Sequence, residues 1–186
     1  IDEVSTLLLK GNIIGWFQGR MEFGPRSLGN RSILADPRIV DMQKKLNLKI
    51  KFRESFRPFA PSIMKEYVRD WFEVPKDCEI NVPFMMQVLP IKPKMRSLIP
   101  SVCHVDGSGR LQTVSKKSNA TYHKLIQKFY ELTNVPMLLN TSFNENEPIV
   151  CSPEEAINCF LRTKMDALVL GEFILFRNTI EELKVL

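Results

Sequence analysis

The 186-residue chain is poor in several features that mark common protein classes. Its four cysteines form no CxxC pair and no regular spacing, which argues against a disulfide framework and a paired-cysteine metal site and favours reduced thiols in a cytoplasmic protein. No apolar run approaches the roughly 20 residues of a membrane span, and no signal peptide is visible, so we expect no membrane partner. A Walker A loop and a recognisable Ser-His-Asp arrangement are also missing, which argues against a side-chain nucleophile.

What the chain does have is an ordinary globular composition with an excess of positive charge. Apolar residues make up 44% and charged residues 25%, and the length suits one domain over 1–186. The net charge of +5 would suit nucleic acid, nucleotides or other anions, and charge alone does not choose among them. The chain opens at Ile1 without a methionine, which we interpret as a piece of a longer polypeptide.

Segments typical of strands and of helices alternate along the chain. The β-branched and aromatic run 12–18 predicts a buried strand, and 119–132 has the apolar spacing of an amphipathic helix. Asp36 and Pro37 suit the N-cap and the first position of a helix that would run to about Leu48. Interleaved elements of this kind predict an α/β fold with a mixed sheet. Helices are also expected at 4–9 and 152–162, further strands at 32–35, 59–64, 83–89, 100–114, 135–140, 166–170 and 173–177, and a mobile surface loop at 90–100.

A loop after the first predicted strand concentrates arginines in a rigid frame. Residues 20–31, Arg-Met-Glu-Phe-Gly-Pro-Arg-Ser-Leu-Gly-Asn-Arg, place three arginines beside two glycines and a proline. Guanidinium groups held in this way suit bidentate contacts with phosphate or carboxylate oxygens. The alternative is that they pair with the nearby acids Glu22 and Asp36. The arginines outnumber these carboxylates, and Arg31 is our candidate for a purely structural role.

A second basic cluster follows at Lys49–Arg57. If this segment is extended, its period of two would place Lys51, Arg53 and Arg57 on one face. A solvated edge strand protected by its lysines is the alternative, and this segment alone does not decide between them. Next to the arginine loop, we favour phosphate binding.

The stretch 104–112 combines a histidine, an aspartate and an arginine. His104 and Asp106 would point the same way on a strand, which suggests a metal site. The only other histidine, His123, lies on a predicted helix, so two ligands give weak support for zinc. We favour a hydrogen-bonded turn that presents Arg110 and Gln112 toward the site.

The polar loop Asn140-Thr-Ser-Phe-Asn144 follows directly after a predicted buried strand. Ligands of α/β sheets bind beyond the C-terminal ends of such strands. The hydroxyls and amides of this loop could bond phosphate oxygens, a ribose or an amide, and a turn or capping cluster is the alternative. Together, the four segments predict electrostatic binding of anions.

These segments resemble the C-terminal domain of the O-carbamoyltransferase family, which includes nodulation, cephalosporin and aminoglycoside carbamoyltransferases. The resemblance implies a YrdC-like twisted mixed β-sheet with flanking helices. It implies that this domain binds ATP and carbamoyl phosphate and forms carbamoyl-adenylate, releasing pyrophosphate and phosphate. The matching stretches keep the family's order over nearly the whole chain and are 19–38, 53–62, 104–107, 110–113, 135–144 and 147–150.

The resemblance also implies partners and residue roles. A preceding Kae1-like domain of the same polypeptide would carry a transition metal and transfer the carbamoyl group to an acceptor hydroxyl. No metal site is expected in this domain, and Mg²⁺ is expected to accompany ATP. By position in the motifs, Arg26, Lys51 and Arg57 are expected to act at the reacting groups. Further ligand contacts are expected from Arg20, Asn30, Arg53, Arg110, Asn140 and Ser142.

Two other functions stay open at this point. YrdC-like domains can bind double-stranded RNA, and this chain is basic. Its positive charge is concentrated in loops fixed by proline and glycine and mixed with acids, without an aromatic-flanked basic stripe, so nucleic acid is the less favoured partner. The third possibility is a degenerate domain that only stabilises its partner domain.

Overall fold

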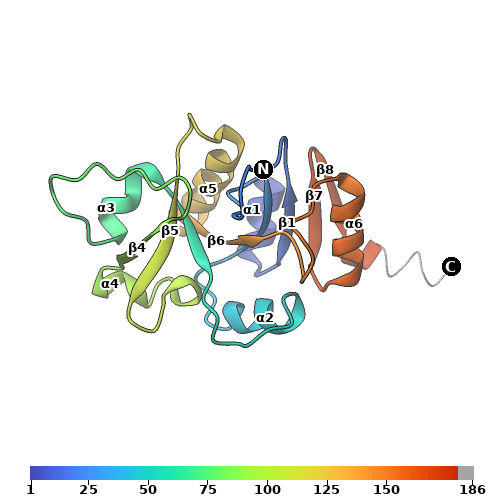
Figure 1. Ribbon diagram of the computed structural model, residues 1–186, viewed down its shortest axis with the longest axis horizontal. Coiled ribbons are helices and arrows are strands. Elements are labelled where there is room, and N and C mark those ends of the chain that lie inside the picture. The colour runs from blue at the N-terminus through green and yellow to red at the C-terminus, as the bar shows by residue number, and fades with distance from the viewer. Residues whose placement is uncertain (180–186) are drawn as a thin grey trace.

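Eight strands form one mixed, strongly twisted sheet in the computed structural model, which describes residues 1–179 (Figure 1). The strand order across the sheet is β4-β5-β3-β6-β2-β1-β7-β8. Two neighbouring pairs, β3 with β5 and β1 with β7, are parallel, and the other pairs are antiparallel. The predicted α/β fold with a mixed sheet is therefore confirmed. The strands are β1 Ile14–Phe17, β2 Arg31–Ala35, β3 Ala60–Met64, β4 Gln87–Pro90, β5 Ser108–Val114, β6 Met137–Ser142, β7 Ala167–Leu170 and β8 Phe173–Phe176.

Helices flank this sheet. Helix α5 packs against α1 and against the central strands β3 and β6, while α6 packs against β1 and β7 (Figure 1). The Asn119 side chain caps the start of α5, and Ser152 with Glu155 forms a capping box at the start of α6. None of these helices in the described part of the chain is both long and apolar enough to cross a bilayer. The helices are α1 Asp2–Leu9, α2 Met42–Lys49, α3 Val68–Trp71, α4 Pro93–Arg96, α5 Ala120–Thr133 and α6 Pro153–Arg162, with short 3₁₀ turns η1 Lys65–Tyr67 and η2 Pro100–Val102.

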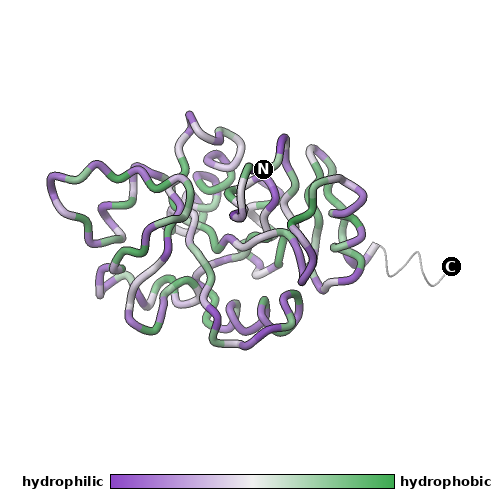
Figure 2. The backbone as a smooth tube through the Cα atoms, viewed as in Figure 1, coloured by the Kyte–Doolittle hydropathy of each residue, from purple (hydrophilic) through white to green (hydrophobic). Residues whose placement is uncertain are grey.

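The hydrophobic core follows the middle of the sheet. Figure 2 shows hydrophobic segments along the central strands and hydrophilic ones on the outer loops and helix surfaces. Large side chains such as Trp16, Phe129, Phe143 and Phe160 are fully or almost fully buried. Burial of side chains of this size supplies the main stabilising free energy of such a domain. The core thus fixes the relative positions of β2, β3 and β6, whose ends carry the candidate site.

The predicted helix start at Asp36–Pro37 is wrong, because α2 begins only at Met42. Asp36 is buried instead of capping a helix. Its carboxylate accepts a hydrogen bond from the backbone N–H of Arg38 at 2.9 Å and pairs with the guanidinium of the same residue at 2.7 Å. A local turn therefore satisfies this carboxylate, and the helix starts one turn and a half later.

The segment 83–114 also differs from its prediction. The strand expected at 83–89 is β4 over Gln87–Pro90, preceded by a turn, and the strand expected from residue 100 begins at Ser108 after the 3₁₀ turn η2. The expected mobile loop 90–100 contains α4 and buries Ile91 and Ile99 completely. Tertiary burial of two isoleucines outweighs the loop-forming preference of the surrounding prolines and lysines.

Candidate functional site

A polar cleft lies where β3 begins and β6 ends, two strands that pair through Ala60 and Asn140. Its volume is about 130 Å³. The arginine loop, the segment before β3, and β5 and β6 contribute its walls. We call it the arginine cleft, and it is lined by Pro25, Arg26, Ser27, Arg53, Pro58, Phe59, Ala60, Met85, Arg110, Asn140, Thr141 and Ser142. Residues from all four sequence segments that predicted anion binding come together there or next to it.

The arginine loop is held by one carboxylate that binds the backbone. Glu22 accepts hydrogen bonds from the N–H groups of Leu28 at 2.6 Å and Asn30 at 2.8 Å. Glu22 therefore organises the turn, and among the described residues it forms no ion pair with the loop arginines. Arg26 is left without an ion pair among the described residues.

Arg31 has the structural role that we expected. Its side chain is buried, and its guanidinium donates to the carbonyls of Gln18 at 2.8 Å and Gly19 at 3.0 Å. The group also lies over the ring of Phe17, 3.5 Å from its centroid. Burial lowers the pKa of Arg31, while Glu22 opposes this shift. This arginine therefore closes the base of the loop and does not reach the cleft.

Three arginines approach one another in the cleft. Arg26, Arg53 and Arg110 form no ion pair within residues 1–179. Burial and then the charge of Arg26 lower the pKa of Arg110, and burial and then the charge of Arg57 lower that of Arg53. Crowded cations with few counter-charges create a positive potential, which favours an anionic ligand.

Polar atoms in the same wall also lack partners. The Nδ2 of Asn140 donates to the carbonyl of Ser27 at 3.1 Å, to Ser62 Oγ at 2.9 Å and to Gln112 Oε1 at 3.1 Å. Its Oδ1, together with Arg26 Nε and Ser27 Oγ, is buried without a hydrogen-bond partner in the described chain. Buried groups of this kind cost free energy, which is a common feature of binding sites.

An outer hollow of about 350 Å³ adjoins the cleft and shares Arg53, Pro58, Phe59 and Arg110 with it. It adds Arg57, which pairs with Glu54 at 3.1 Å and is half exposed. The cationic surface thus extends beyond the small cleft and offers room for a ligand longer than one phosphate. The remaining lining residues of this outer hollow are Val88 and His104.

Lys51 lies behind the wall of the cleft. Its side chain is buried, and Nζ donates to the carbonyl of Ser142 at 2.7 Å, to the carbonyl of Asn144 at 2.6 Å and to Asn144 Oδ1 at 2.6 Å. Burial and then the charge of Arg53 lower the pKa of Lys51 to about 7. Oxygen acceptors favour the ammonium form and burial disfavours it, so this group holds Ser142 and Asn144 in place and titrates near neutrality.

The low pKa of Lys51 predicts a pH-dependent stability. From pH 7 to pH 9, the lysine keeps its proton in the unfolded chain, where its pKa is 10.5, and loses it in the folded chain, where its pKa is about 7. The unfolded state then binds more protons, so the free energy of unfolding rises with pH, by at most about 1.4 kcal/mol per pH unit. Urea denaturation at pH 7, 8 and 9 measures the free energy of unfolding of wild type and of Lys51→Met. The wild-type value minus the Lys51→Met value is expected to grow with pH. A difference that stays constant with pH would contradict the assignment.

The structure separates the remaining predicted residues into two groups. Arg53, Arg110, Asn140 and Ser142 join Arg26 in the cleft, and Arg57 lies next to it. Arg20 and Asn30 are not among the lining residues, and Asn30 donates to the Arg20 carbonyl at 2.8 Å and accepts from Asn119 at 2.8 Å. Their assignment as ligand contacts stays a prediction.

The extended conformation expected for 51–57 is wrong. Backbone N–H groups of Lys51 and Arg53 bond to the carbonyls of Leu46 and Asn47 at the end of α2, and Phe52 has a positive φ of 43°. The resulting turns send Lys51 inward and Arg53 with Arg57 toward the hollows. A positive φ at a phenylalanine is uncommon and has no signal in the sequence.

The predicted turn at 104–112 is confirmed. Asp106 Oδ1 accepts from the Ser108 N–H at 2.9 Å and from Ser108 Oγ at 2.6 Å. Arg110 lines the cleft as expected, whereas Gln112 is buried behind it, donating to the Leu28 carbonyl at 2.8 Å.

Some residues of the site were not assigned individually from the sequence. Ser27 and Thr141 line the cleft, and Asn144 fixes Lys51. Thr141 and Asn144 belong to the polar loop that was expected to bind a ligand. Asn144 follows Ser142 at a spacing of two, which was a usable signal on an extended segment. Pro58, Phe59 and Met85 carry no charge or catalytic chemistry, and only the fold brings them to the cleft. In the described part of the chain, no group of three or more His, Cys, Asp or Glu side chains could hold a metal ion.

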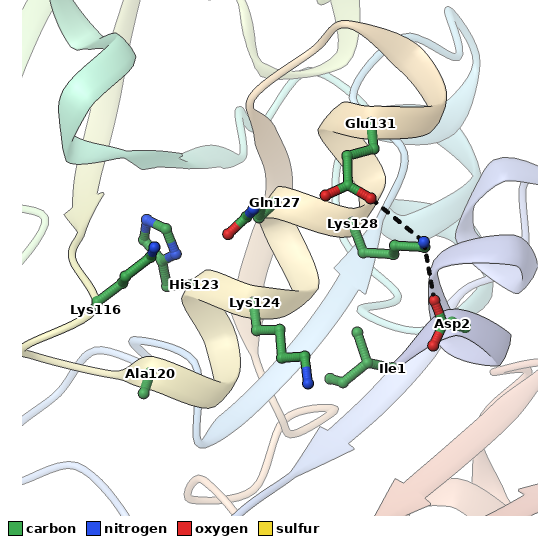
Figure 3. A pocket seen from close by; sticks show the side chains of 9 residues that line it. All are labelled: Ile1, Asp2, Lys116, Ala120, His123, Lys124, Gln127, Lys128 and Glu131. Carbon is green, nitrogen blue, oxygen red and sulfur yellow. Dashed lines mark ion pairs between the residues drawn. The ribbon is translucent and has the colours of Figure 1, made fainter.

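A separate hollow of about 450 Å³ lies along α5 (Figure 3). Three lysines and His123 line it together with Asp2 and Glu131. Lys128 pairs with both carboxylates, at 3.1 Å and 3.3 Å, as the dashed lines show. Within the part of the chain that the structure describes, the hollow shares no lining residue with the arginine cleft and contains no arginine. We therefore place the candidate site in the arginine cleft.

Comparison with known proteins gives a family and a fold. The family model described as carbamoyltransferase C-terminus matches residues 5–177. The nodulation protein NolNO of Sinorhizobium fredii is 50% identical over 91% of this chain and 25% of its own length. The chain spans about a quarter to a third of the curated relatives that it matches. Among solved structures, full-length HypF in a phosphate- and nucleotide-bound form has a TM-score of 0.60 at 17% identity, covering 91% of this chain and 20% of HypF. P. abyssi Sua5 complexed with L-threonine has a TM-score of 0.62 at 14% identity, covering 91% and 46%.

Proposed function

The chain belongs to the carbamoyltransferase family as its C-terminal domain, and on this premise we propose that its arginine cleft binds ATP and carbamoyl phosphate and forms carbamoyl-adenylate. The observation that carries the proposal is the convergence of Arg26, Arg53 and Arg110 without a carboxylate partner in the described chain. Two phosphorylated substrates would supply anionic partners for these three arginines. HypF, which shares the fold, carries phosphate and nucleotide, in agreement with the proposal.

The chemistry divides into two balanced steps. Water first replaces the phosphate of carbamoyl phosphate, which gives carbamate and phosphate. A carbamate oxygen then attacks the α-phosphorus of ATP, the bond from this phosphorus to the bridging oxygen breaks, and pyrophosphate leaves with the electron pair. The guanidinium groups would stabilise charge on the α-phosphate and on the leaving pyrophosphate, and they would hold the reacting atoms in line.

The cleft suggests how Mg²⁺ and the wall residues would contribute. Among residues 1–179 no carboxylate lines the cleft, so the lining residues do not fit a protein-bound Mg²⁺, and a magnesium ion would be carried by the triphosphate oxygens. Ser142 lines the cleft, is held by Lys51 through its carbonyl, and donates its hydroxyl hydrogen to Asn144 Oδ1 at 2.7 Å, so its Oγ would meet a ligand as an acceptor. The neutral amide of Asn140 and the Ser27 hydroxyl suit the uncharged part of a carbamoyl group.

Transfer to an acceptor requires more of the polypeptide. We propose that a preceding Kae1-like domain, with its own transition metal, receives carbamoyl-adenylate and passes the carbamoyl group to an acceptor hydroxyl. The length of the relatives, three to four times that of this chain, supports this arrangement.

ATP binding is the first test. ATP at about 100 times its Kd is expected to stabilise the chain by about 2.7 kcal/mol, which raises Tm by several degrees. Arg57→Ala is expected to reduce this rise, and Lys44→Ala, which removes an exposed α2 charge, should leave it unchanged. Exchange of labelled pyrophosphate into ATP, dependent on carbamoyl phosphate, then tests adenylate formation.

Two outcomes would contradict the proposal. If neither ATP nor carbamoyl phosphate shifts Tm, the cleft does not bind these substrates. If instead duplex RNA gives a salt-sensitive gel shift that ATP does not compete with, the basic surface serves nucleic acid.

A further inference from the structure

The turn that precedes β5 fixes the protonation pattern of one histidine. Ser108 Oγ donates its hydrogen to Asp106 Oδ1 at 2.6 Å, because the carboxylate can only accept. His104 Nδ1 lies 3.2 Å from the same Ser108 Oγ. Since the hydroxyl hydrogen is already used, the contact requires the imidazole to donate from Nδ1. The chain Asp106–Ser108–His104 therefore leaves His104 Nε2 with a free lone pair.

The surroundings of His104 keep it neutral. Burial lowers its pKa, and Arg110 acts in the same direction, while Asp106 opposes them. Nε2 has no hydrogen-bond partner in the described chain, and it is not fully buried. His104 thus offers an accessible acceptor at the edge of a surface that otherwise presents arginine donors.

This acceptor stands between a cationic and an apolar region. A third hollow of about 430 Å³ shares Pro58 and His104 with the outer hollow, which in turn joins the arginine cleft. Its walls include Phe56 and Val105, whose side chains are 74% and 108% exposed. We call it the Phe56 hollow, and its lining residues are Gln43, Phe56, Pro58, Cys103, His104, Val105 and Asp106.

The charge and polarity along this path match a ligand that is anionic at one end and flat, apolar and hydrogen-donating at the other. A nucleoside triphosphate whose base carries an exocyclic amine has this distribution. An aromatic ring is a sequence-tolerant stacking surface for a base, and a neutral imidazole nitrogen accepts an amine hydrogen but repels a carbonyl oxygen.

We propose that the Phe56 hollow is the nucleobase subsite and that His104 Nε2 selects a 6-amino purine by accepting its exocyclic N–H. The inference rests on the proposed function and extends it to the specificity of the site. Ser108 is the positioning residue, because its hydroxyl fixes which imidazole nitrogen is free.

The test compares three ligands by calorimetry on the 186-residue chain: ATP, inosine triphosphate and inorganic triphosphate. Wild type is expected to bind ATP about five to ten times more tightly than inosine triphosphate, the size of one net hydrogen bond. Phe56→Ala should weaken ATP about fivefold or more. Inorganic triphosphate should bind all variants within twofold of wild type, since the arginines are unchanged.

His104→Gln tests the selectivity most directly, because a glutamine amide can present either an acceptor or a donor to the base. It is expected to bind ATP and inosine triphosphate equally, and Ser108→Ala should lower the selectivity at least threefold by freeing the imidazole. Thermal melting without ligand checks that each variant is folded. If His104→Gln and Ser108→Ala unfold, Phe56→Ala still tests the inference, because Phe56 is exposed and its loss should not unfold the chain.

The outcomes distinguish the inference from the proposed function. Equal binding of the two nucleotides by wild type, or selectivity that persists in His104→Gln, overturns the inference and leaves the proposed function standing. If ATP does not bind at all, both fail.

Discussion

Arg110→Ala is expected to weaken binding of ATP and of inorganic triphosphate by about 30-fold, because a charge-assisted contact to phosphate contributes about 2 kcal/mol. Arg110 lines both the arginine cleft and the outer hollow, so both parts of the cationic surface lose a donor. Unliganded stability should stay unchanged or rise, since the variant removes a partly buried charge and its repulsion with Arg26, the two causes that lower the pKa of Arg110. Weaker binding without lower stability is the signature of a functional arginine.

Calorimetry for affinity and urea denaturation for stability measure the two effects in one preparation. Arg110→Lys retains the charge without the planar fork and should fall between wild type and alanine. Lys44→Ala matches the change in net charge on an exposed helix face and should bind as wild type does. Affinity within threefold of wild type would remove Arg110 from the site, and a loss of several kcal/mol in stability would make its role structural.

Gly29→Ala is expected to destabilise the chain by about 4 kcal/mol or more, a large part of the 5–15 kcal/mol typical of a domain. Gly29 has φ of 108°, where a side chain is strained by about 1–3 kcal/mol. An added Cβ would also lie 2.2 Å from Cδ1 of Tyr122, a fully buried ring that cannot move without disturbing the core. The Gly29 carbonyl accepts from Trp16 Nε1 at 2.8 Å, so displacement of the loop also costs a buried hydrogen bond.

Gly24→Ala is the matched control within the same loop. Gly24 has φ of 115°, and an added Cβ would meet no atom within 4 Å. The stability that Gly24→Ala loses should therefore come from conformational strain alone, about 1–3 kcal/mol. Urea denaturation of both variants separates strain from steric overlap. Equal losses would show that Tyr122 can yield and that the loop packs less tightly than the structure indicates.

The sequence predicted which residues gather at the cleft better than it predicted their geometry. The arginine loop was singled out because guanidinium groups in a loop fixed by proline and glycine indicate anion binding. Arg110 was expected to face the site from a turn, and Ser142 was assigned from the family resemblance. Residues of all three lie at the cleft. Arg31 was the candidate for a structural role, and the structure agrees, since its guanidinium lies over the Phe17 ring and donates to backbone carbonyls. The mixed sheet followed from interleaved helical and strand periodicity.

The predicted backbone conformations and side-chain directions were wrong where tertiary contacts outweighed local preference. Lys51 and Arg53 appeared equivalent in sequence, yet one is buried against the Ser142 carbonyl and the other lines the cleft. The two side chains diverge at a turn in which Phe52 has a positive φ and the N–H groups of Lys51 and Arg53 bond to carbonyls of α2. Asp36 resembled a helix cap, and its partner turned out to be Arg38.

The amino-acid sequence by itself determined which groups are available: an excess of arginines in short rigid loops, a polar loop after a buried strand, and an alternation that forms an α/β sheet. These are properties of single residues and of local spacing, so they can be read along the chain. Tertiary structure decided which cations share one space. Arg26 and Ser142 are more than a hundred residues apart in the chain, and they meet because β2, β3 and β6 are neighbours in the sheet. The same packing brings His104 and Phe56 together, and it buries Lys51 so that its pKa falls to about 7. Burial and charge proximity are sums over many distant contacts, and only the folded core fixes those distances.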